Sequence, residues 1–211
     1  MNEYLKQLNT PNELNHEFFE NLREYAKENN VPIIEEDSLV LIQSILNMID
    51  AKNMLEIGTA IGYSGSIMLS AGVESLTTVD INSKYLQMAK LSFEKCGFVD
   101  NVNIIEGDAK NVLPQLVESG HKFDMVFLDG AKGQYIRYLP MLTKLIGKNG
   151  IIFADNVLLQ GMVESDAVIP HRKRTMVVNL REYLKVVNMY PYQSELVRLE
   201  DGICITKYKG E

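Results

Sequence analysis

Apolar side chains recur at helical spacing in the first fifty residues, with charged residues between them. The first stripe consists of Leu14, Phe18, Phe19, Leu22 and Tyr25. It predicts that residues 1–31 are mostly helical, starting near Pro11 and ending before Pro32. A second stripe, which runs from Leu39 to Ile49, predicts a helix over residues 36–49.

From residue 54 the pattern changes to short apolar runs that alternate with helical stretches. The runs cover residues 54–58, 76–80, 102–108, 123–129 and 151–155. The helical stretches between them cover residues 63–71, 83–96, 109–118 and 135–146. Such alternation predicts βαβ units, and therefore an α/β fold with a Rossmann-like, doubly wound, mostly parallel sheet and helices on both faces.

The last forty residues follow a different pattern. A predicted helix over 172–189 is followed by two β-like runs, residues 193–199 and 203–208. Glu200-Asp201-Gly202 lies between the two runs, and Asp-Gly at such a place is a hairpin signal. We therefore expect the sheet to end in an antiparallel C-terminal hairpin.

Composition excludes several classes of protein. The chain has 211 residues, 46% of them hydrophobic, and this argues against disorder. Its net charge of -7 excludes a uniformly basic nucleic-acid binder, although not a local basic patch. Cys96 and Cys204 make no disulfide framework, and no apolar run approaches the ~20 residues of a membrane span. The polar N-terminus has no apolar core of a signal peptide, so we expect a cytoplasmic protein.

A glycine-bearing turn follows the first apolar run. In Gly58-Thr59-Ala60-Ile61-Gly62 the tight turn is kept, but Ala60 occupies the second glycine position of the dinucleotide-binding pattern. Asp80 ends the next run and is placed to accept hydrogen bonds from ribose hydroxyls. The turn and this acid together predict an adenosine-type cofactor, and they leave open whether it is a dinucleotide or S-adenosylmethionine. Asp108 ends the third run and can accept a hydrogen bond from an adenine amino group.

Three further oxygen-bearing side chains follow the fourth and fifth runs. Asp129 ends one run, and Asp155 and Asn156 end the next. Because parallel strands end at the same edge of a sheet, these side chains can converge on one divalent cation such as Mg²⁺. Zinc is disfavoured because neither His nor Cys joins the set. Lys132, on the turn after Asp129, is a candidate general base, since a nearby cation would lower its pKa.

These motifs resemble a known family. The segments LEIGTAIGYS (55–64), TVD (78–80), EGDA (106–109), FLDGAKGQY (127–135) and ADNVLLQG (154–161) are similar to the Mg²⁺- and S-adenosylmethionine-dependent O-methyltransferases of the catechol and caffeoyl-CoA type. The resemblance covers roughly residues 30–208. It implies a single methyltransferase domain over 1–211, with an N-terminal helical cap (1–50) and a Rossmann-like catalytic core (51–211).

The resemblance also implies roles for individual residues. Asp129, Asp155 and Asn156 would bind the metal, and Lys132 would be the catalytic base. The implied cofactor-binding residues are Ile34, Glu35, Gly58, Ser64, Asp80, Asp108, Ala109 and Asp129.

Within that family, two features resemble the bacterial tRNA 5-hydroxyuridine methyltransferases more than the plant enzymes. One is AKGQY together with DNVLLQGMV, and the other is the basic cluster His171-Arg172-Lys173-Arg174. Cations at a helix N-terminus oppose the helix dipole, so stability alone does not explain them. Arg172, Lys173 and Arg174 are therefore expected to contact RNA phosphates. This favours the tRNA anticodon loop as partner, and methylation of wobble 5-hydroxyuridine to 5-methoxyuridine.

Several alternatives remain open from the sequence. A small catechol or hydroxylated phenylpropanoid offers the same pair of adjacent oxygens without needing a basic cluster. An NAD(P)-dependent reductase fits the turn and Asp80, but neither the imperfect glycine pattern nor the oxygen-bearing triad. A binding module with a vestigial site is a third possibility. We also predict a homodimer. Phe18, Phe19 and Tyr25 offer aromatic surface for self-association, and proteins that this chain resembles are commonly homodimers. The alternative is that these side chains pack on their own chain.

Overall fold

The computed structural model describes residues 16–210, which form two compact units. Unit 1 ends at Asp108, and unit 2 begins at Ala109. Among the described residues, no helix has the length and apolar character needed to cross a membrane.

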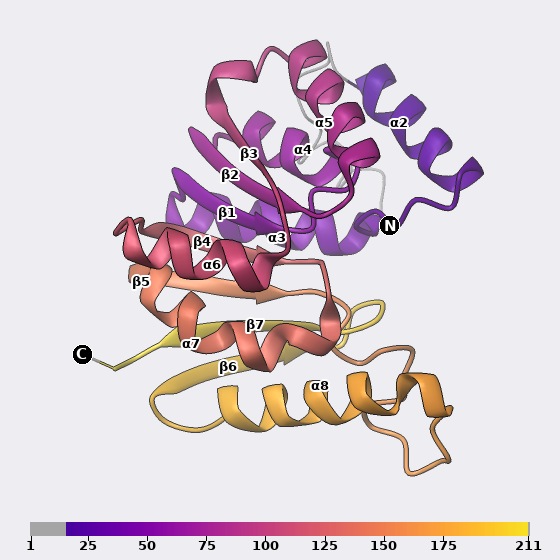
Figure 1. Cartoon of the computed structure of the whole chain (residues 1–211), viewed down its shortest axis with the longest axis vertical. Helices are drawn as coiled ribbons and strands as arrows, with labels where there is room; N and C mark the ends of the chain where they lie inside the picture. The colour runs from indigo at the N-terminus through magenta and orange to yellow at the C-terminus, as the bar shows by residue number, and fades with distance from the viewer. Residues whose placement is uncertain (1–15, 211) are drawn as a thin grey trace. The chain divides into compact units, whose positions relative to one another are not determined.

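Unit 1 contains three parallel strands with helices packed around them (Figure 1). The strands are β1 (Asn53–Ile57), β2 (Ser75–Asp80) and β3 (Val102–Glu106), in the order β3-β2-β1. The helices are α2 (His16–Glu28), α3 (Glu36–Ile49), α4 (Tyr63–Ser70) and α5 (Ser83–Lys95), with a short 3-10 turn at Val99–Asn101. The pairing of Ile57 with Val79 and of Asp80 with Glu106 brings the carboxyl ends of the three strands to one edge.

The aromatic residues of the first predicted helix pack in and around the core of unit 1. α2 buries Phe19, Leu22 and Ala26 on one face, as helical spacing requires. The Phe19 ring meets that of Tyr63, at the start of α4, edge to face at 6.3 Å. Phe18 contacts Phe19, and the Lys95 ammonium lies 5.7 Å above the Phe18 ring. Phe18, Phe19 and Leu22 of the first apolar stripe therefore pack within unit 1, whereas Tyr25 is exposed. Leu14 and Pro11 lie outside the described residues.

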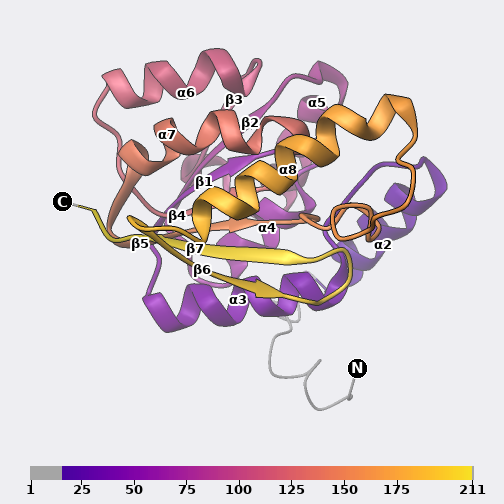
Figure 2. The same ribbon diagram turned by 90° about the horizontal axis from the view of Figure 1, so that it is seen from below.

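Unit 2 contains a mixed sheet with the strand order β4-β5-β7-β6. β4 (Phe123–Leu128) and β5 (Ile146–Ala154) are parallel, whereas β7 (Ile203–Tyr208) runs antiparallel to β5 and to β6 (Tyr192–Val197). The helices α6 (Ala109–Glu118), α7 (Tyr135–Leu145) and α8 (Arg174–Val187) lie on one face of these strands (Figure 2). Short 3-10 turns at Lys132–Gln134 and His171–Lys173 precede α7 and α8.

The loop between β5 and α8 is fixed by side chains of unit 2. The Arg181 guanidinium donates hydrogen bonds to the carbonyls of Val163 (2.8 Å) and Ser165 (2.7 Å). Arg198 and Glu164 form an exposed ion pair at 2.6 Å. The backbone N–H groups of Val157 and Leu158 donate to carbonyls of the β6–β7 turn. The residues that follow Asp155 and Asn156 therefore hold a defined conformation although they form neither helix nor strand.

Most predicted elements occur within one or two residues of their predicted bounds, and the C-terminal hairpin is confirmed. One bound is wrong by more, and one helix start shifts by two residues. β5 begins at Ile146 and not at residue 151, because the polar segment Gly147–Gly150 continues the strand through a bulge. α8 begins at Arg174, because residues 171–173 form a 3-10 turn. The single methyltransferase domain with a cap over 1–50 stays a prediction.

Candidate functional site

The glycine-bearing turn of unit 1 joins β1 to α4. Gly58, Ala60 and Gly62 all have positive φ angles, of 110°, 44° and 79°. Glycine tolerates such angles, whereas Ala60 adopts one at a steric cost. Gly62 is also required for packing, because a Cβ there would lie 3.0 Å from the Ala89 Cα of α5. The turn is thus kept tight against α5 without the standard glycine pattern.

Asp80 fixes the turn from the end of β2. One carboxylate oxygen accepts a hydrogen bond from the Ala60 backbone N–H at 2.9 Å, and the other accepts from the Asn82 N–H at 2.8 Å. These bonds hold the side chain beside the turn, and each oxygen keeps a further lone pair. Asp80 can therefore accept hydrogen bonds from ligand hydroxyls without releasing the backbone.

A buried polar network lies beneath the same turn. The Glu56 carboxylate, within β1 and inaccessible to solvent, accepts hydrogen bonds from the hydroxyls of Ser64 (2.5 Å) and Thr78 (2.6 Å). The Thr78 and Thr59 hydroxyls are 2.6 Å apart. Ser64, predicted to bind cofactor, is therefore also a structural link between α4 and β1. The one signal of this network in the sequence is Glu56 itself, an isolated acid inside an apolar run.

The other predicted cofactor residues lie in separate places. Asp108 follows Gly107, whose N–H donates to the Asp80 carbonyl at 2.9 Å, so these two predicted acids follow adjacent strand ends. Ile34 is buried, and the exposed Glu35 is the N-cap of α3. Ala109 is the first residue of α6 in unit 2.

Unit 2 brings together the predicted metal ligands. Asp129 follows β4, and Asp155 and Asn156 follow β5. The strand ends are tied because the Asp155 N–H donates to the Leu128 carbonyl at 2.9 Å. Asn156 has a φ of 53°, which Asn tolerates better than most residues, and its N–H donates to Asp155 Oδ1 at 2.7 Å.

The electrostatics of this edge fit a cation. Burial and the nearby charge of Asp129 raise the pKa of Asp155 to about 7, and Asp155 is only 2% exposed. Burial also raises the pKa of Asp129, although the positive charge of Lys132 opposes this shift. In the described part of the chain, no three His, Cys, Asp or Glu side chains gather into a metal-binding group. Two carboxylates and one amide offer oxygen atoms, which are the ligands that a hard ion such as Mg²⁺ takes.

Lys132 lies on the 3-10 turn between β4 and α7. Its ammonium is 3.4 Å from Asp129 Oδ1, and both side chains are partly exposed. α8 supports this turn, because the Asn179 side-chain amide donates to the Gly133 carbonyl at 2.7 Å. The amine is therefore placed beside the predicted metal ligands and can still be reached by a ligand.

Tyr135 is a structural residue of this edge that sequence reasoning missed. Its fully buried hydroxyl donates to the Leu128 carbonyl at 2.9 Å and approaches the Asp155 carbonyl at 3.3 Å. The phenol therefore holds together the two strand ends that carry Asp129 and Asp155. Its position in the helical stripe of α7 indicates only that it is buried.

The basic cluster His171–Arg174 lies near the loop that follows Asn156. The Lys173 ammonium is 3.3 Å from the Gln160 side-chain oxygen, and Arg174 Nε donates to the Ile169 carbonyl at 3.2 Å. Arg172 is exposed and forms no ion pair within residues 16–210. Since α8 also contacts the Lys132 turn, unit 2 places the cluster on the same segment that supports Lys132.

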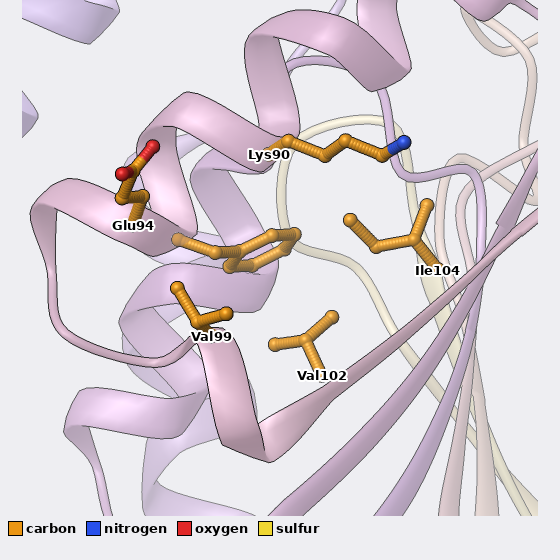
Figure 3. A pocket seen from close by; sticks show the side chains of 6 residues that line it. Lys90, Glu94, Val99, Val102 and Ile104 are labelled. Carbon is orange, nitrogen blue, oxygen red and sulfur yellow. The ribbon is translucent and has the colours of Figure 1, made fainter.

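A cavity of about 490 Å³ in unit 1 is separate from these residues. It is lined by Lys90, Phe93, Glu94, Val99, Val102 and Ile104, from α5, β3 and the turn between them (Figure 3). None of the predicted cofactor residues lines it. This cavity therefore does not belong to the predicted cofactor site.

Comparison with known proteins decides the family. Residues 9–209 match the model of the O-methyltransferase family. The chain belongs to this family. Membership disfavours the NAD(P)-dependent reductase that the turn and Asp80 had left open.

Similar proteins agree with this membership. The catechol O-methyltransferase of Niastella koreensis is 36% identical over 125 residues, which cover 58% of this chain and 57% of that protein. A Staphylococcus aureus protein, provisionally assigned as a caffeoyl-CoA O-methyltransferase, is 34% identical, with a TM-score of 0.82 over 91% of this chain and 92% of that one. The O-methyltransferase of Bacillus cereus, solved in complex with SAH (S-adenosylhomocysteine), has a TM-score of 0.84 at 21% identity, over 98% and 96% of the two chains. These likenesses confirm the predicted fold class.

Proposed function

We propose that the protein is an S-adenosylmethionine- and Mg²⁺-dependent O-methyltransferase of small acceptors with two adjacent oxygens, such as catechols. The observation that carries the proposal is the edge of unit 2 where Asp129, Asp155 and Asn156 meet beside Lys132. Family membership and the likeness to a catechol O-methyltransferase support it. The small acceptor, the alternative to tRNA in the sequence analysis, now has the better support.

Unit 1 supplies the proposed cofactor-binding residues. The turn from Gly58 to Gly62 gives a tight backbone surface, and Asp80 would accept hydrogen bonds from the ribose hydroxyls of S-adenosylmethionine. Asp108 would accept a hydrogen bond from the adenine amino group. The relative from Bacillus cereus, which shares the fold, was solved in complex with SAH, and this supports the choice of cofactor.

Unit 2 supplies the proposed acceptor chemistry. Asp129, Asp155 and Asn156 would hold Mg²⁺, which when bound orients the two acceptor oxygens and makes the hydroxyl more acidic. Lys132 would remove the proton from that hydroxyl, and the resulting oxygen would attack the sulfonium methyl group in line. Without a metal, the Lys132 ammonium pairs with Asp129. A bound cation would favour the neutral amine that a general base requires. Holding the two substrates in line lets orientation contribute to the acceleration of such a reaction.

A second acceptor, 5-hydroxyuridine at the tRNA wobble position, is favoured by one observation. The basic cluster His171–Arg174 lies next to the loop after Asn156 and at the start of the helix that supports the Lys132 turn. 5-Hydroxyuracil offers its 5-hydroxyl and 4-carbonyl oxygens in the same adjacent relation as a catechol. A wobble nucleotide is single-stranded and can be splayed into a pocket.

Methyl transfer to both acceptors decides between the two. Wild type and the variant with Arg172→Gln, Lys173→Gln and Arg174→Gln would be given catechol or tRNA that carries 5-hydroxyuridine at the wobble position. If tRNA is the substrate, the variant shows a raised KM for tRNA, and its catechol methylation is nearly unchanged. Nucleoside mass spectrometry of tRNA from cells lacking the gene would then show 5-hydroxyuridine in place of 5-methoxyuridine. Catechol methylation with intact 5-methoxyuridine in those cells supports the small acceptor.

A further inference from the structure

One carbonyl group joins the two strand ends that carry Asp129 and Asp155. The Leu128 carbonyl accepts hydrogen bonds from the Asp155 N–H at 2.9 Å and from the Tyr135 hydroxyl at 2.9 Å. A carbonyl oxygen has two lone pairs, so these two bonds use its capacity in full. Leu128 pairs with Ala154 in the parallel register, and the two aspartates directly follow this pair. The spacing of the aspartate backbones is therefore set at this carbonyl.

Tyr135 is itself held firmly at the start of α7. Its backbone N–H donates to the Lys132 carbonyl, and its ring meets that of Tyr183 from α8 edge to face at 5.8 Å. The hydroxyl also lies 3.3 Å from the Asp155 carbonyl oxygen, on the other strand end. The side chain is inaccessible to solvent, so water cannot replace these contacts. The phenol therefore spans both strand ends from a fixed position.

The spacing of the strand ends determines where the two carboxylates lie. Only one methylene group joins an aspartate carboxylate to its backbone, and both side chains are largely buried: Asp155 is 2% exposed, and the side chain of Asp129 17%. Mg²⁺ requires nearly octahedral ligands at about 2.0–2.1 Å, whereas Ca²⁺ accepts looser arrangements at about 2.3–2.6 Å. A fixed spacing can therefore discriminate between the two ions by size, whereas mobile strand ends would adapt to either.

The number of ligands also favours the smaller ion. Asp129, Asp155 and Asn156 supply three side chains, two of them carboxylates. Mg²⁺ is usually bound through one or two carboxylates and keeps several waters, whereas Ca²⁺ takes about six to eight oxygens. A small and rigid set of oxygen ligands therefore matches Mg²⁺.

We propose that the Tyr135 hydroxyl is a positioning group that makes this edge select Mg²⁺ over Ca²⁺. The inference rests on the proposed metal site of Asp129, Asp155 and Asn156. Without the hydroxyl, the Leu128 carbonyl would keep the Asp155 N–H but lose its second donor, and the strand ends would be freer to separate. Groups that hold metal ligands in place typically contribute about 10–100-fold in affinity. The demanding geometry of Mg²⁺ makes it lose more of this affinity than Ca²⁺ does.

Calorimetric titration of the full chain with MgCl₂ and with CaCl₂ tests the inference. It is done above the pKa of Asp155, which is about 7, so that this carboxylate is ionised. Wild type should bind Mg²⁺ more tightly, and in Tyr135→Phe the ratio of Mg²⁺ to Ca²⁺ affinity should fall about tenfold. Phenylalanine keeps the ring that packs on Tyr183, so the change removes only the hydroxyl. A role in stability alone would weaken both ions alike and leave this ratio unchanged.

Tyr183→Phe is the matched control. Both tyrosines are fully buried and their rings are in contact, but the Tyr183 hydroxyl lies toward Thr206 and Cys204 of β7. Within residues 16–210 that hydroxyl donates to neither strand end. The control should therefore keep the wild-type ratio. Both variants should bind SAH like wild type, because neither hydroxyl belongs to the proposed cofactor-binding residues.

The outcomes distinguish this inference from the proposed function. A wild type without preference for Mg²⁺, an unchanged ratio in Tyr135→Phe, or an equal fall in Tyr183→Phe would overturn the role of the hydroxyl and leave the metal site intact. If wild type binds neither ion, the proposed metal site fails, and the inference fails with it. If Tyr135→Phe folds only with metal, the cation concentrations that restore its fold give the same ratio, because an ion that binds only the folded chain stabilises it according to its affinity.

Discussion

Asp155 carries a buried carboxyl group, and its surroundings destabilise the ionised form of that group. Its pKa rises from 3.8 to about 7 in the folded chain. Between these values the folded chain binds more protons than the unfolded chain, so stability falls as the pH rises through this window. We predict that, in the presence of a chelator, this contribution lowers the thermal midpoint between about pH 4 and pH 7, and that Asp155→Asn removes much of this fall. Mg²⁺ should restore the wild-type midpoint at the higher pH, and an identical pH dependence of the two proteins would contradict this role of Asp155.

Lys132 is the candidate base because its amine lies beside Asp129 and is partly exposed. We predict that Lys132→Ala lowers the turnover of methyl transfer by about 10²–10⁴-fold, while the midpoint shift caused by Mg²⁺ is largely kept. Lys185→Ala, at an exposed position on α8, is the control. Turnover of Lys132→Ala equal to wild type across the pH profile would show that the proton is removed without this amine.

The positions of some site residues could be predicted from the sequence, whereas the roles of others could not. Asp129, Asp155 and Asn156 could be placed together because residues that follow parallel strands share one edge of a sheet. The roles of Glu56 and Tyr135 could not be predicted in the same way. Their hydrogen bonds join segments 22 and 20 residues apart, Thr78 in one case and Asp155 in the other. Only the packed structure decides which of several buried polar groups lie opposite them.

The β1–α4 turn is the element on which the proposed cofactor binding depends. At Gly62 an alanine would meet both a positive φ of 79° and the backbone of Ala89, whereas at Gly72 it would meet only a positive φ of 107°. We predict that Gly72→Ala costs about 1 kcal/mol of unfolding free energy, and that Gly62→Ala costs clearly more and weakens SAH binding. Denaturant titration and calorimetry measure the two effects, and equal losses in both variants would show that contact with α5 is unimportant.

The difference between predicted and observed β5 has a physical reason. Gly147-Lys148-Asn149-Gly150 has no apolar alternation, so the pattern indicates a turn. In the structure it is a bulge, because Ile146 already pairs with Phe123 before the main register begins at Ile151. Patterns of apolar residues locate buried strand segments well, but they do not reveal polar residues inserted into a strand. The hairpin of β6 and β7 was predictable because its Asp-Gly turn carries a local signal.

For the whole molecule, self-association remains a prediction. Phe19 is buried, and Phe18 packs against it and Lys95 within unit 1, so of the three aromatic residues only Tyr25 is exposed, at 39%. If the protein is a dimer, its interface must therefore include surface other than Phe18 and Phe19, on which the prediction was based. Sedimentation at about micromolar concentration should give twice the 23.9 kDa mass of one chain. The mass of a single chain there would exclude the dimer.

The transfer of labelled methyl groups from S-adenosylmethionine to catechol tests the proposed chemistry most directly. We predict a monomethylated product when Mg²⁺ is present, and loss of the product when a chelator is added. Asp155→Ala should also lose this product, yet it should still bind SAH, because its side chain belongs to the metal-binding set of unit 2. Transfer that is equal with and without chelator, or no transfer to either catechol or tRNA, would contradict a metal-dependent O-methyltransferase.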